Sequence, residues 1–488
     1  MKPVKTLIFF LSVFALLALV SLVFPKDGIK IGEKMDIQFM DLGNLFKNDS
    51  AEINIVTAGL INFNTVSDDP EFGGIDSVLL MRDAVSDASN DSLVKAKIDS
   101  ISNAIQPIEF SSEGKALLHK FFERANKAES ASKPLRILHY GDSQIENDRM
   151  TSLMRYRLQM IFGGSGCGLV PAVPLYFGNP TFKEKIEGEW TRYTGFGKRD
   201  TTLEDKRYGV MNSFTAVPPD SLDDEKSLRF EFIKGRRASR FSSMKLFLHA
   251  YDESGQISIQ VNDTICDTLT NVFEGFQVID YRAEVAVKNI QIDFELHNGG
   301  RIYGIAFDAN AGIQVDNLAM RGSSGLEFRR QDSAYLKHML DFLSPGLFIM
   351  QFGGNTVPYI KKTGYYKSSF KRELAYIKSL CPDAALIVIG PADMSRKENG
   401  KFITWESVEP VRDALRSAAL EADYAYWDMY EAMGGENSMD AFVQSDPPLA
   451  QADYIHFTPK GANLMTEMFC NSLMVEYSRY QSAVGSEQ

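Results

Sequence analysis

Short apolar runs that alternate with amphipathic segments indicate an α/β fold. Four runs have the length and composition of buried strands: residues 135–140, 347–352, 385–390 and, with a weaker pattern, 425–427. Residues 367–380 and 406–422 lie between the last three of these runs and carry apolar side chains at helical spacing. This alternation of strands and helices predicts a parallel sheet with helices on both faces.

Residues 181–312 follow a different pattern, in which apolar and polar side chains alternate along short segments separated by turn residues. The clearest of these segments are residues 228–233, 245–249, 257–261 and 290–296. Such a series is typical of an antiparallel β-sandwich or jelly roll. We therefore predict a β-rich domain inserted between two pieces of one α/β domain.

The N-terminus begins with an uncharged apolar run at residues 6–24, which is long enough to cross a bilayer as a helix. Lys2 and Lys5 precede it and favour a cytoplasmic N-terminus. We predict an uncleaved membrane anchor, with a cleaved signal peptide as the alternative. The remainder would then be extracytoplasmic, in a periplasm and anchored to the inner membrane, or secreted if the segment is cleaved.

The predicted organisation has five parts. They are a membrane helix at 1–25, a spacer with a packing helix at 26–132, the first part of the α/β domain at 133–180, the β-rich insertion at 181–312, and the second part of the α/β domain at 313–480.

Composition narrows the choice of partners. The formal net charge of −12 among 488 residues argues against nucleic acid as the main ligand, because phosphate binding needs a basic face. The four cysteines, Cys167, Cys266, Cys381 and Cys470, lack the spacing of a structural metal site. An exported location would permit disulfides, while scattered buried thiols are an equal alternative.

The first candidate for chemistry is Ser143, which follows Gly141 and Asp142 where the first predicted strand ends. A serine at such a turn can expose its hydroxyl beside the backbone amides of a helix that we expect from Glu146. Ser143 and Glu146 also have the spacing of a capping box, so the serine could instead cap that helix.

Two further candidates follow later strands. Gly353, Gly354 and Asn355 come directly after a buried run, where an asparagine amide can face a developing oxyanion or simply form a turn. Asp453 stands three residues before His456, and a turn could let the carboxylate orient the imidazole.

The order of these motifs resembles that of the SGNH (GDSL-like) hydrolase family, over residues 135–174 and 312–478. The resemblance implies a three-layer, flavodoxin-like α/β fold. The β-rich insertion is most similar to the carbohydrate-binding-like module that splits the catalytic domain of peptidoglycan O-acetyl esterases. Gln144 departs from the family pattern, in which an aliphatic residue or histidine more often follows the serine.

The resemblance also implies a role for each motif. Ser143 would be the nucleophile, His456 the general base, Asp453 the residue that orients it, and Asn355 an oxyanion donor. The glycine that the family uses as a second donor would be Gly322, with Gly168 as the alternative. No metal or organic cofactor is implied, because chemistry through an acyl-serine needs neither.

The expected activity is that of a serine carbohydrate O-acetyl esterase acting on an acetylated envelope or extracellular glycan, with peptidoglycan as one candidate. One alternative is an O-acetyltransferase that uses the same acyl-serine, working beside a membrane-bound O-acyltransferase. Another is a non-catalytic glycan-binding protein whose β-rich insertion is the working part. The acetyl preference comes from the resemblance alone.

Overall fold

The computed structural model describes residues 105–175, 178–197, 203–219, 226–253 and 255–486, together with the strand residues 29–30 and 36–37. The predicted membrane helix and most of the predicted spacer lie outside these residues. In the part that is described, no helix is both long and apolar enough to span a membrane. The chain divides into two units, Met1–Thr57 and Ala58–Gln488. In the first, β1 (Ile29–Lys30) and β2 (Asp36–Ile37) pair antiparallel.

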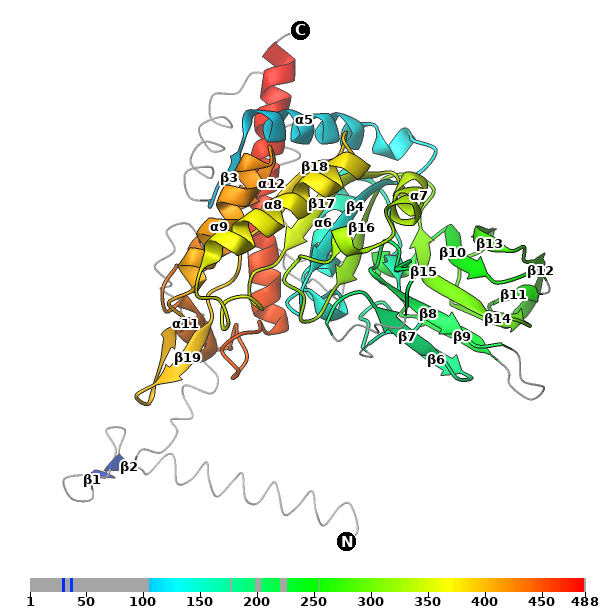
Figure 1. The fold of residues 1–488 in the computed structure, drawn as a ribbon, viewed down its shortest axis with the longest axis horizontal. Coiled ribbons are helices and arrows are strands. Elements are labelled where there is room, and N and C mark those ends of the chain that lie inside the picture. The colour runs from blue at the N-terminus through cyan, green and yellow to red at the C-terminus, as the bar shows by residue number, and fades with distance from the viewer. Residues whose placement is uncertain are drawn as a thin grey trace. The chain divides into compact units, whose positions relative to one another are not determined.

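The second unit contains a mixed six-stranded sheet in the order β16-β4-β17-β18-β21-β3 (Figure 1). Its strands are β3 (Ile108–Phe110), β4 (Leu135–Gly141), β16 (Ile313–Ala319), β17 (Pro345–Gln351), β18 (Ala385–Ile389) and β21 (Ala425–Trp427). All neighbours run parallel except β3, which pairs antiparallel with β21. Every residue of β4, β17 and β18 is buried. Burial on both faces explains why these strands appear in the sequence as continuous apolar runs.

Helices cover both faces of this sheet. They are α5 (Ser112–Asn126), α6 (Thr151–Phe162), α7 (Ser333–Leu343), α8 (Thr363–Leu380), α9 (Val408–Glu421), α10 (Met429–Met433), α11 (Ser438–Gln444) and α12 (Pro459–Ser486). Alternate strand residues point to opposite faces. Tyr140 and Met350 join the core formed with α7, α8 and α9. His139 instead bonds Thr151 of α6, and Trp427 packs on Phe469 of α12.

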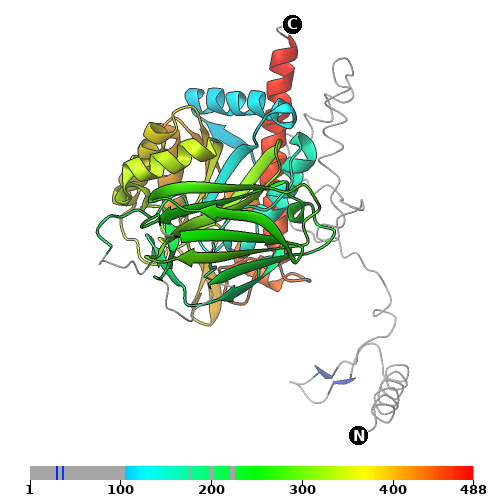
Figure 2. The ribbon, with the colours of Figure 1, turned by 90° about the vertical axis from the view of Figure 1, so that its right-hand side faces the viewer.

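A β-sandwich lies to the right of the sheet in Figure 1, and its strands face the viewer in Figure 2. One layer has the order β13-β10-β15-β8-β7, with β5 also paired to β15, and the other has the order β12-β11-β14-β9-β6. The bounds are β5 (Gly168–Val170), β6 (Phe182–Glu187), β7 (Thr191–Thr194), β8 (Ser213–Val217), β9 (Ser227–Phe232), β10 (Ser243–Ala250), β11 (Gly255–Val261), β12 (Thr264–Asn271), β13 (Gly275–Arg282), β14 (Asn289–Leu296) and β15 (Gly300–Asp308). All pairings between its strands are antiparallel. The strand β5 precedes residue 181, so the layer extends beyond the segment with the alternating pattern.

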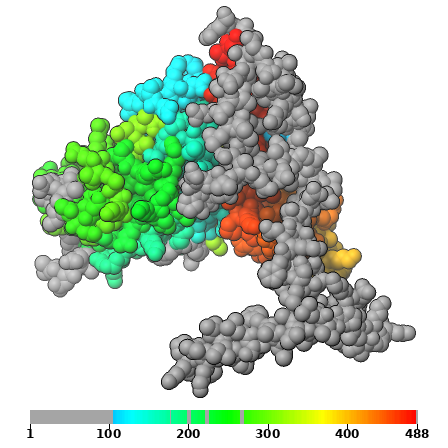
Figure 3. All heavy atoms as spheres, turned by 180° about the vertical axis from the view of Figure 1, so that it is seen from behind, coloured from blue at the N-terminus to red at the C-terminus, as the bar shows by residue number. Residues whose placement is uncertain are grey.

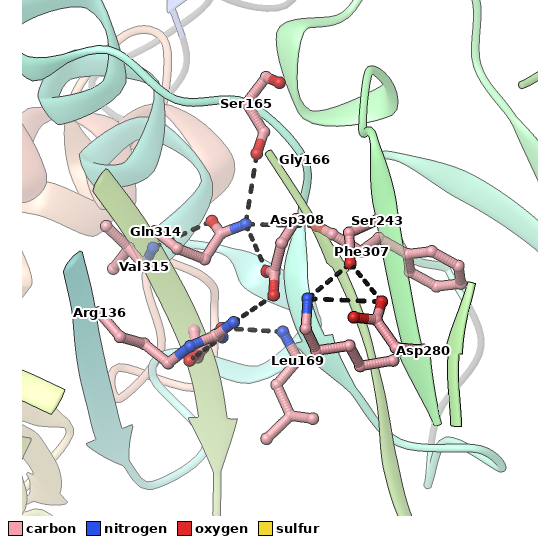
Figure 4. Close-up of polar contacts among 12 residues, drawn as sticks. Arg136, Ser165, Gly166, Leu169, Ser243, Asp280, Phe307, Asp308, Gln314 and Val315 are labelled. Carbon is pink, nitrogen blue, oxygen red and sulfur yellow. Dashed lines mark hydrogen bonds and ion pairs between the residues drawn. The ribbon is translucent and has the colours of Figure 1, made fainter. Parts of the chain in front are cut away.

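A buried ion cluster joins the sandwich to the α/β sheet (Figure 4). The guanidinium of Arg136 on β4 donates from Nη1 to both carboxylate oxygens of Asp316 on β16, at 2.6 and 2.7 Å. Its Nη2 pairs with Asp308 at the end of β15. Asp316 also accepts the N–H of Leu169 on β5 at 2.8 Å, and Gln314 donates to Asp308 at 3.1 Å. The space-filling view shows the green sandwich residues directly beside the cyan and blue-green residues that precede them in the chain (Figure 3).

Two details of the sequence-based prediction are tested by this fold. The mixed α/β architecture with parallel and antiparallel sheets is confirmed. The helix expected from Glu146 is wrong in its start, because α6 begins only at Thr151, after a short 3₁₀ turn. Asn147 and Asp148 have φ values of 55° and 61°, and left-handed residues cannot continue a right-handed helix.

Three of the four cysteines have described side chains, and all three are free thiols. Cys167 and Cys470 are buried and Cys381 is partly buried. The side chain of Cys266 lies outside the described residues.

Candidate active site

The predicted site residues converge at the carboxyl ends of three neighbouring parallel strands. Gly141 at the end of β4 is aligned with Ala319 of β16 on one side and with Gln351 of β17 on the other. The loops that carry the candidate residues after these strands therefore start at one level. Open parallel sheets characteristically bind ligands at this edge.

Ser143, His456 and Asp453 form a continuous hydrogen-bonded chain. The hydroxyl of Ser143 lies 2.8 Å from Nε2 of His456, and Nδ1 of the same ring lies 2.7 Å from Oδ2 of Asp453. With the proton on Nδ1, Nε2 is the acceptor for the serine proton. The side chains of His456 and Asp453 are 24% and 42% exposed, so the base can be reached by solvent. The serine side chain bonds the imidazole and does not cap a helix.

The turn from Asp453 to His456 holds this geometry. Oδ1 of Asp453 accepts the backbone N–H groups of Ile455 and His456, both at 3.0 Å, which leaves Oδ2 to face the ring. Tyr454 adopts a φ of 60°, which closes the turn. Partial burial of Asp453 acts to raise its pKa, but the hydrogen bonds from His456 and Ile455 outweigh it, and the pKa lies below its ordinary value. Asp453 is therefore ionised when the imidazole takes up a proton.

Asn355 is bonded to Asp142, the residue before the nucleophile. Its Nδ2 donates to Oδ2 of Asp142 and to the backbone carbonyl of Ser323, each at 3.1 Å. Asp142 is only 4% exposed, and its Oδ1 accepts the N–H of Gln144 at 3.0 Å. Burial raises the pKa of Asp142 to about 6. Both hydrogen-bond contacts of the Asn355 amide nitrogen in this structure are therefore with protein acceptors.

The two candidate glycines occupy different places. Gly322 is exposed on the loop after β16, has a φ of 78°, and precedes Ser323, whose carbonyl accepts from Asn355. Gly168 is paired with Phe307 in β5, and a Cβ there would meet Asp316. Neither glycine lines the cavity that contains Ser143. Only Gly322 belongs to the loop that reaches Asn355.

A cavity of about 200 Å³ opens beside the nucleophile. Ser143, His456 and Asn355 form part of its wall, and the rest is largely apolar: Phe352, Gly354, Pro358, Tyr359, Pro391, Ala392, Met394, Met429 and Ile455. Across the described residues, no group of three His, Cys, Asp or Glu side chains is arranged to hold a metal ion. Among the residues that the structure describes, none accepts a hydrogen bond from the backbone N–H of Ser143. This N–H can therefore donate to a bound oxyanion. This arrangement is that of a serine hydrolase.

Two contributors to the site were not recognised from the sequence. Asp142 was only a spacer between Gly141 and Ser143, and Gln144 was only a departure from the family pattern. Asp142 meets Asn355 across 213 residues, and Gln144 meets the His456 loop across 311. Their one signal is adjacency to the nucleophile, which does not reveal the distant partner.

We expect Asp142→Asn to abolish one source of pH-dependent stability and to lower turnover. Because folding raises the pKa of Asp142 to about 6, its contribution to stability is present below about pH 4 and is lost as the pH rises through 6. Between pH 4 and 8 the wild type should therefore lose about 3 kcal/mol of unfolding free energy that the variant keeps. An asparagine also accepts with only one oxygen, so it cannot serve both Gln144 and Asn355, and kcat should fall about tenfold.

Urea unfolding at both pH values measures the first effect, and steady-state kinetics the second. Asp413→Asn is the control, because the Asp413 side chain is 61% exposed. If the stability of wild type and of Asp142→Asn depended on pH in the same way, the raised pKa of the buried Asp142 carboxyl would be contradicted.

Comparisons with known proteins agree at the level of the fold. No protein-family model matches the sequence, and no curated protein matches it either. A solved structure of a peptidoglycan O-acetylesterase superimposes with a TM-score of 0.61 and 19% identity, covering 78% of this chain and 99% of that one.

Two other solved structures show only partial likeness. A family two carbohydrate esterase from Clostridium thermocellum gives a TM-score of 0.23 at 10% identity, over 61% of this chain and 99% of that one. An acetylxylan esterase from Geobacillus stearothermophilus gives 0.25 at 16%, over 33% and 73%. The fold assignment depends on neither. The superposition with the first structure shows that this chain shares the fold of that peptidoglycan O-acetylesterase. The hydrogen-bonded serine, aspartate and histidine follow one another along the chain in the order of the SGNH-like motifs.

Proposed function

We propose that the protein is a serine esterase that removes O-acetyl groups from an extracytoplasmic glycan, with peptidoglycan as the preferred substrate. The observation that carries the proposal is the chain of contacts from Ser143 through His456 to Asp453, which opens onto a small cavity. The predicted helix at 6–24 would hold the enzyme at the membrane with this site outside the cytoplasm.

The size of the cavity supports a short acyl group. Its 200 Å³ is below the ~300–1,000 Å³ of most small-molecule pockets. Gly354, Ala392 and the methionines Met394 and Met429 give it an apolar wall. A methyl group fits such a space, whereas a long acyl chain would leave much of its surface in water.

In the proposed reaction, His456 takes the proton of Ser143 as Oγ attacks the ester carbonyl. The carbonyl π bond opens to an oxyanion, which accepts hydrogen bonds from the N–H of Ser143 and from Asn355 as proposed donors. His456 then protonates the departing sugar oxygen, and the C–O bond to it breaks, leaving acetyl-serine. Water attacks this ester in a second cycle with the same base and releases acetate.

A second observation supports a glycan as the substrate. Tyr359 lines the mouth of the cavity, yet its side chain is 85% exposed. Its backbone is fixed, because its N–H bonds the carbonyl of Thr356 at 3.2 Å and Ser407 bonds the carbonyl of Val357 at 2.6 Å. An exposed aromatic ring on such a fixed backbone can stack on the C–H face of a sugar. The shared fold with a peptidoglycan O-acetylesterase gives further support.

Acetate release from a panel of acetylated polymers tests the proposal. O-acetylated peptidoglycan, acetylated xylan and acetylated cello-oligosaccharides would be compared at equal ester concentration, with Ser143→Ala protein as the blank. We expect the highest kcat/KM on peptidoglycan. Absence of Ser143-dependent acetate from every polymer, with activity on small esters intact, would refute the glycan substrate but not the esterase.

We expect Tyr359→Ala to raise KM for the acetylated polymer about fivefold, since stacking of one ring contributes on the order of 1 kcal/mol. Hydrolysis of p-nitrophenyl acetate should hardly change, because that ester has no sugar to stack. Tyr365→Ala is a matched control: Tyr365 is also strongly exposed, at 76%, but does not line the cavity. The same KM change in both variants would rule out a specific platform.

A further inference from the structure

The side chain of Gln144 connects the nucleophile segment to the loop that carries the base. Its Nε2 donates to the carbonyl of Ile455 at 2.5 Å, and its Oε1 accepts the N–H of Phe457 at 3.4 Å. These two groups flank His456 on either side. The amide therefore bonds to this loop much as a neighbouring strand would, with one donor and one acceptor pointing the same way.

Other contacts hold this loop against the fold without involving the segment that carries Ser143. The N–H of Ser395 donates to the carbonyl of Tyr454 at 3.1 Å, the ring of Tyr454 stacks on Phe402, and Phe457 is buried. Residues 451–458 form no helix or strand apart from one isolated bridge at Phe457. Gln451 bonds the loop to itself, through its N–H to the carbonyl of His456 at 2.8 Å and its Nε2 to the carbonyl of Phe457 at 3.0 Å. These contacts shape the turn, but they do not connect it to the serine. Gln144 does, and it is the residue directly after the nucleophile.

We infer that Gln144 is a positioning residue that sets the distance between the hydroxyl of Ser143 and the imidazole of His456. The inference rests on the proposed function and deepens it. One peptide bond joins Ser143 to Gln144, and the two side-chain contacts of Gln144 hold the residues on either side of His456. The position of the imidazole is therefore tied to that of the hydroxyl. An aliphatic side chain at this position could pack against the loop but could not fix its register. Displacement of a catalytic group by about 1 Å can cost ~10²-fold in rate.

The test compares Gln144→Met with Gln451→Met. Both replacements keep the side-chain length and remove the amide, but only the first cuts the connection to the nucleophile. Activity on p-nitrophenyl acetate is divided by the concentration of active sites titrated with a fluorophosphonate. We expect Gln144→Met to lower kcat per titrated site at least tenfold with unchanged KM, and Gln451→Met to lower it less than twofold. Simple loss of folded protein would lower the number of sites and leave kcat per site unchanged.

A charged variant gives a second readout. Gln144→Glu keeps the acceptor for Phe457 but loses the donor to Ile455 at neutral pH, so kcat per site should again fall. A carboxylate held against this loop also favours the protonated imidazole, which is inactive as a base. The acid limb of the kcat/KM profile should therefore move to higher pH. No such movement is expected if the side chain points into solvent.

The inference is overturned if Gln144→Met retains wild-type kcat per titrated site, or if both glutamine variants lose turnover equally. Failure of the proposed function would look different. In that case Ser143→Ala would keep its ester hydrolysis, and no fluorophosphonate titration of Ser143 would be possible.

Discussion

Replacement of Ser143 or of His456 by alanine should each abolish hydrolysis of p-nitrophenyl acetate, with kcat lower by on the order of 10⁴–10⁶-fold. Both residues act in one nucleophilic step, joined by a contact of 2.8 Å. Without the imidazole the hydroxyl keeps its proton, and without the hydroxyl the imidazole has nothing to activate. The double variant should therefore be no slower than either single one.

Measurement requires burst-free steady-state rates corrected for contaminating esterase, and circular dichroism to show that each variant folds. Labelling by a fluorophosphonate gives an independent readout, which should vanish in Ser143→Ala and slow strongly in His456→Ala. A double variant far slower than both single ones would show two independent catalytic groups. Substantial activity in Ser143→Ala would place the nucleophile elsewhere.

Asn355→Ala should lower kcat by ~10²–10³-fold with little change in KM, the usual cost of one oxyanion donor. The donor matters mainly when negative charge develops on the carbonyl oxygen, which is why substrate binding should be spared. In the structure Nδ2 of Asn355 is shared between Asp142 and Ser323. Donation to an oxyanion therefore requires one of these 3.1 Å contacts to loosen as the charge forms.

Asn317→Ala is a close control for this variant. The Nδ2 of Asn317 also donates to two oxygens, those of Ile145 and Thr151, at 2.8 and 2.7 Å, but Asn317 does not line the cavity with Ser143. Both variants should unfold at lower temperature, because each leaves partly buried acceptors unpaired. Only Asn355→Ala should lose turnover per titrated site. Equal kcat in the two variants would mean that Asn355 acts only on stability.

Sequence patterns predicted those parts of the molecule whose structure is determined by residues close together in the sequence. The strands at 135–141 and 385–389 are buried on both faces, so their apolar runs are unambiguous. Asp453 and His456 belong to one turn, and their spacing alone brings the carboxylate to the ring. The start of α6 was predicted wrongly, because the left-handed conformations of Asn147 and Asp148 depend on the surrounding fold and not on helical periodicity.

Contacts between distant segments could not be predicted in the same way. Asp142 belongs to the Gly141–Ser143 motif, but its role depends on a contact with Asn355, which is close to it only in the folded sheet. Arg136 stands in an apolar run and looks like an exception to it. Its partners Asp308 and Asp316 lie 172 and 180 residues further along the chain, and no local pattern connects them.

The cluster around Arg136 also limits how the sandwich can be exchanged between proteins during evolution. Arg136 and Asp316 belong to the catalytic sheet, whereas Asp308 and the N–H of Leu169 come from strands of the sandwich. Excision of the sandwich would leave the fully buried guanidinium with one carboxylate fewer, and a broken buried pair costs about 3–5 kcal/mol. That loss is a large fraction of the stability of an ordinary domain. Genetic exchange of the sandwich between proteins would therefore succeed only when its charged partners on the catalytic sheet travel with it.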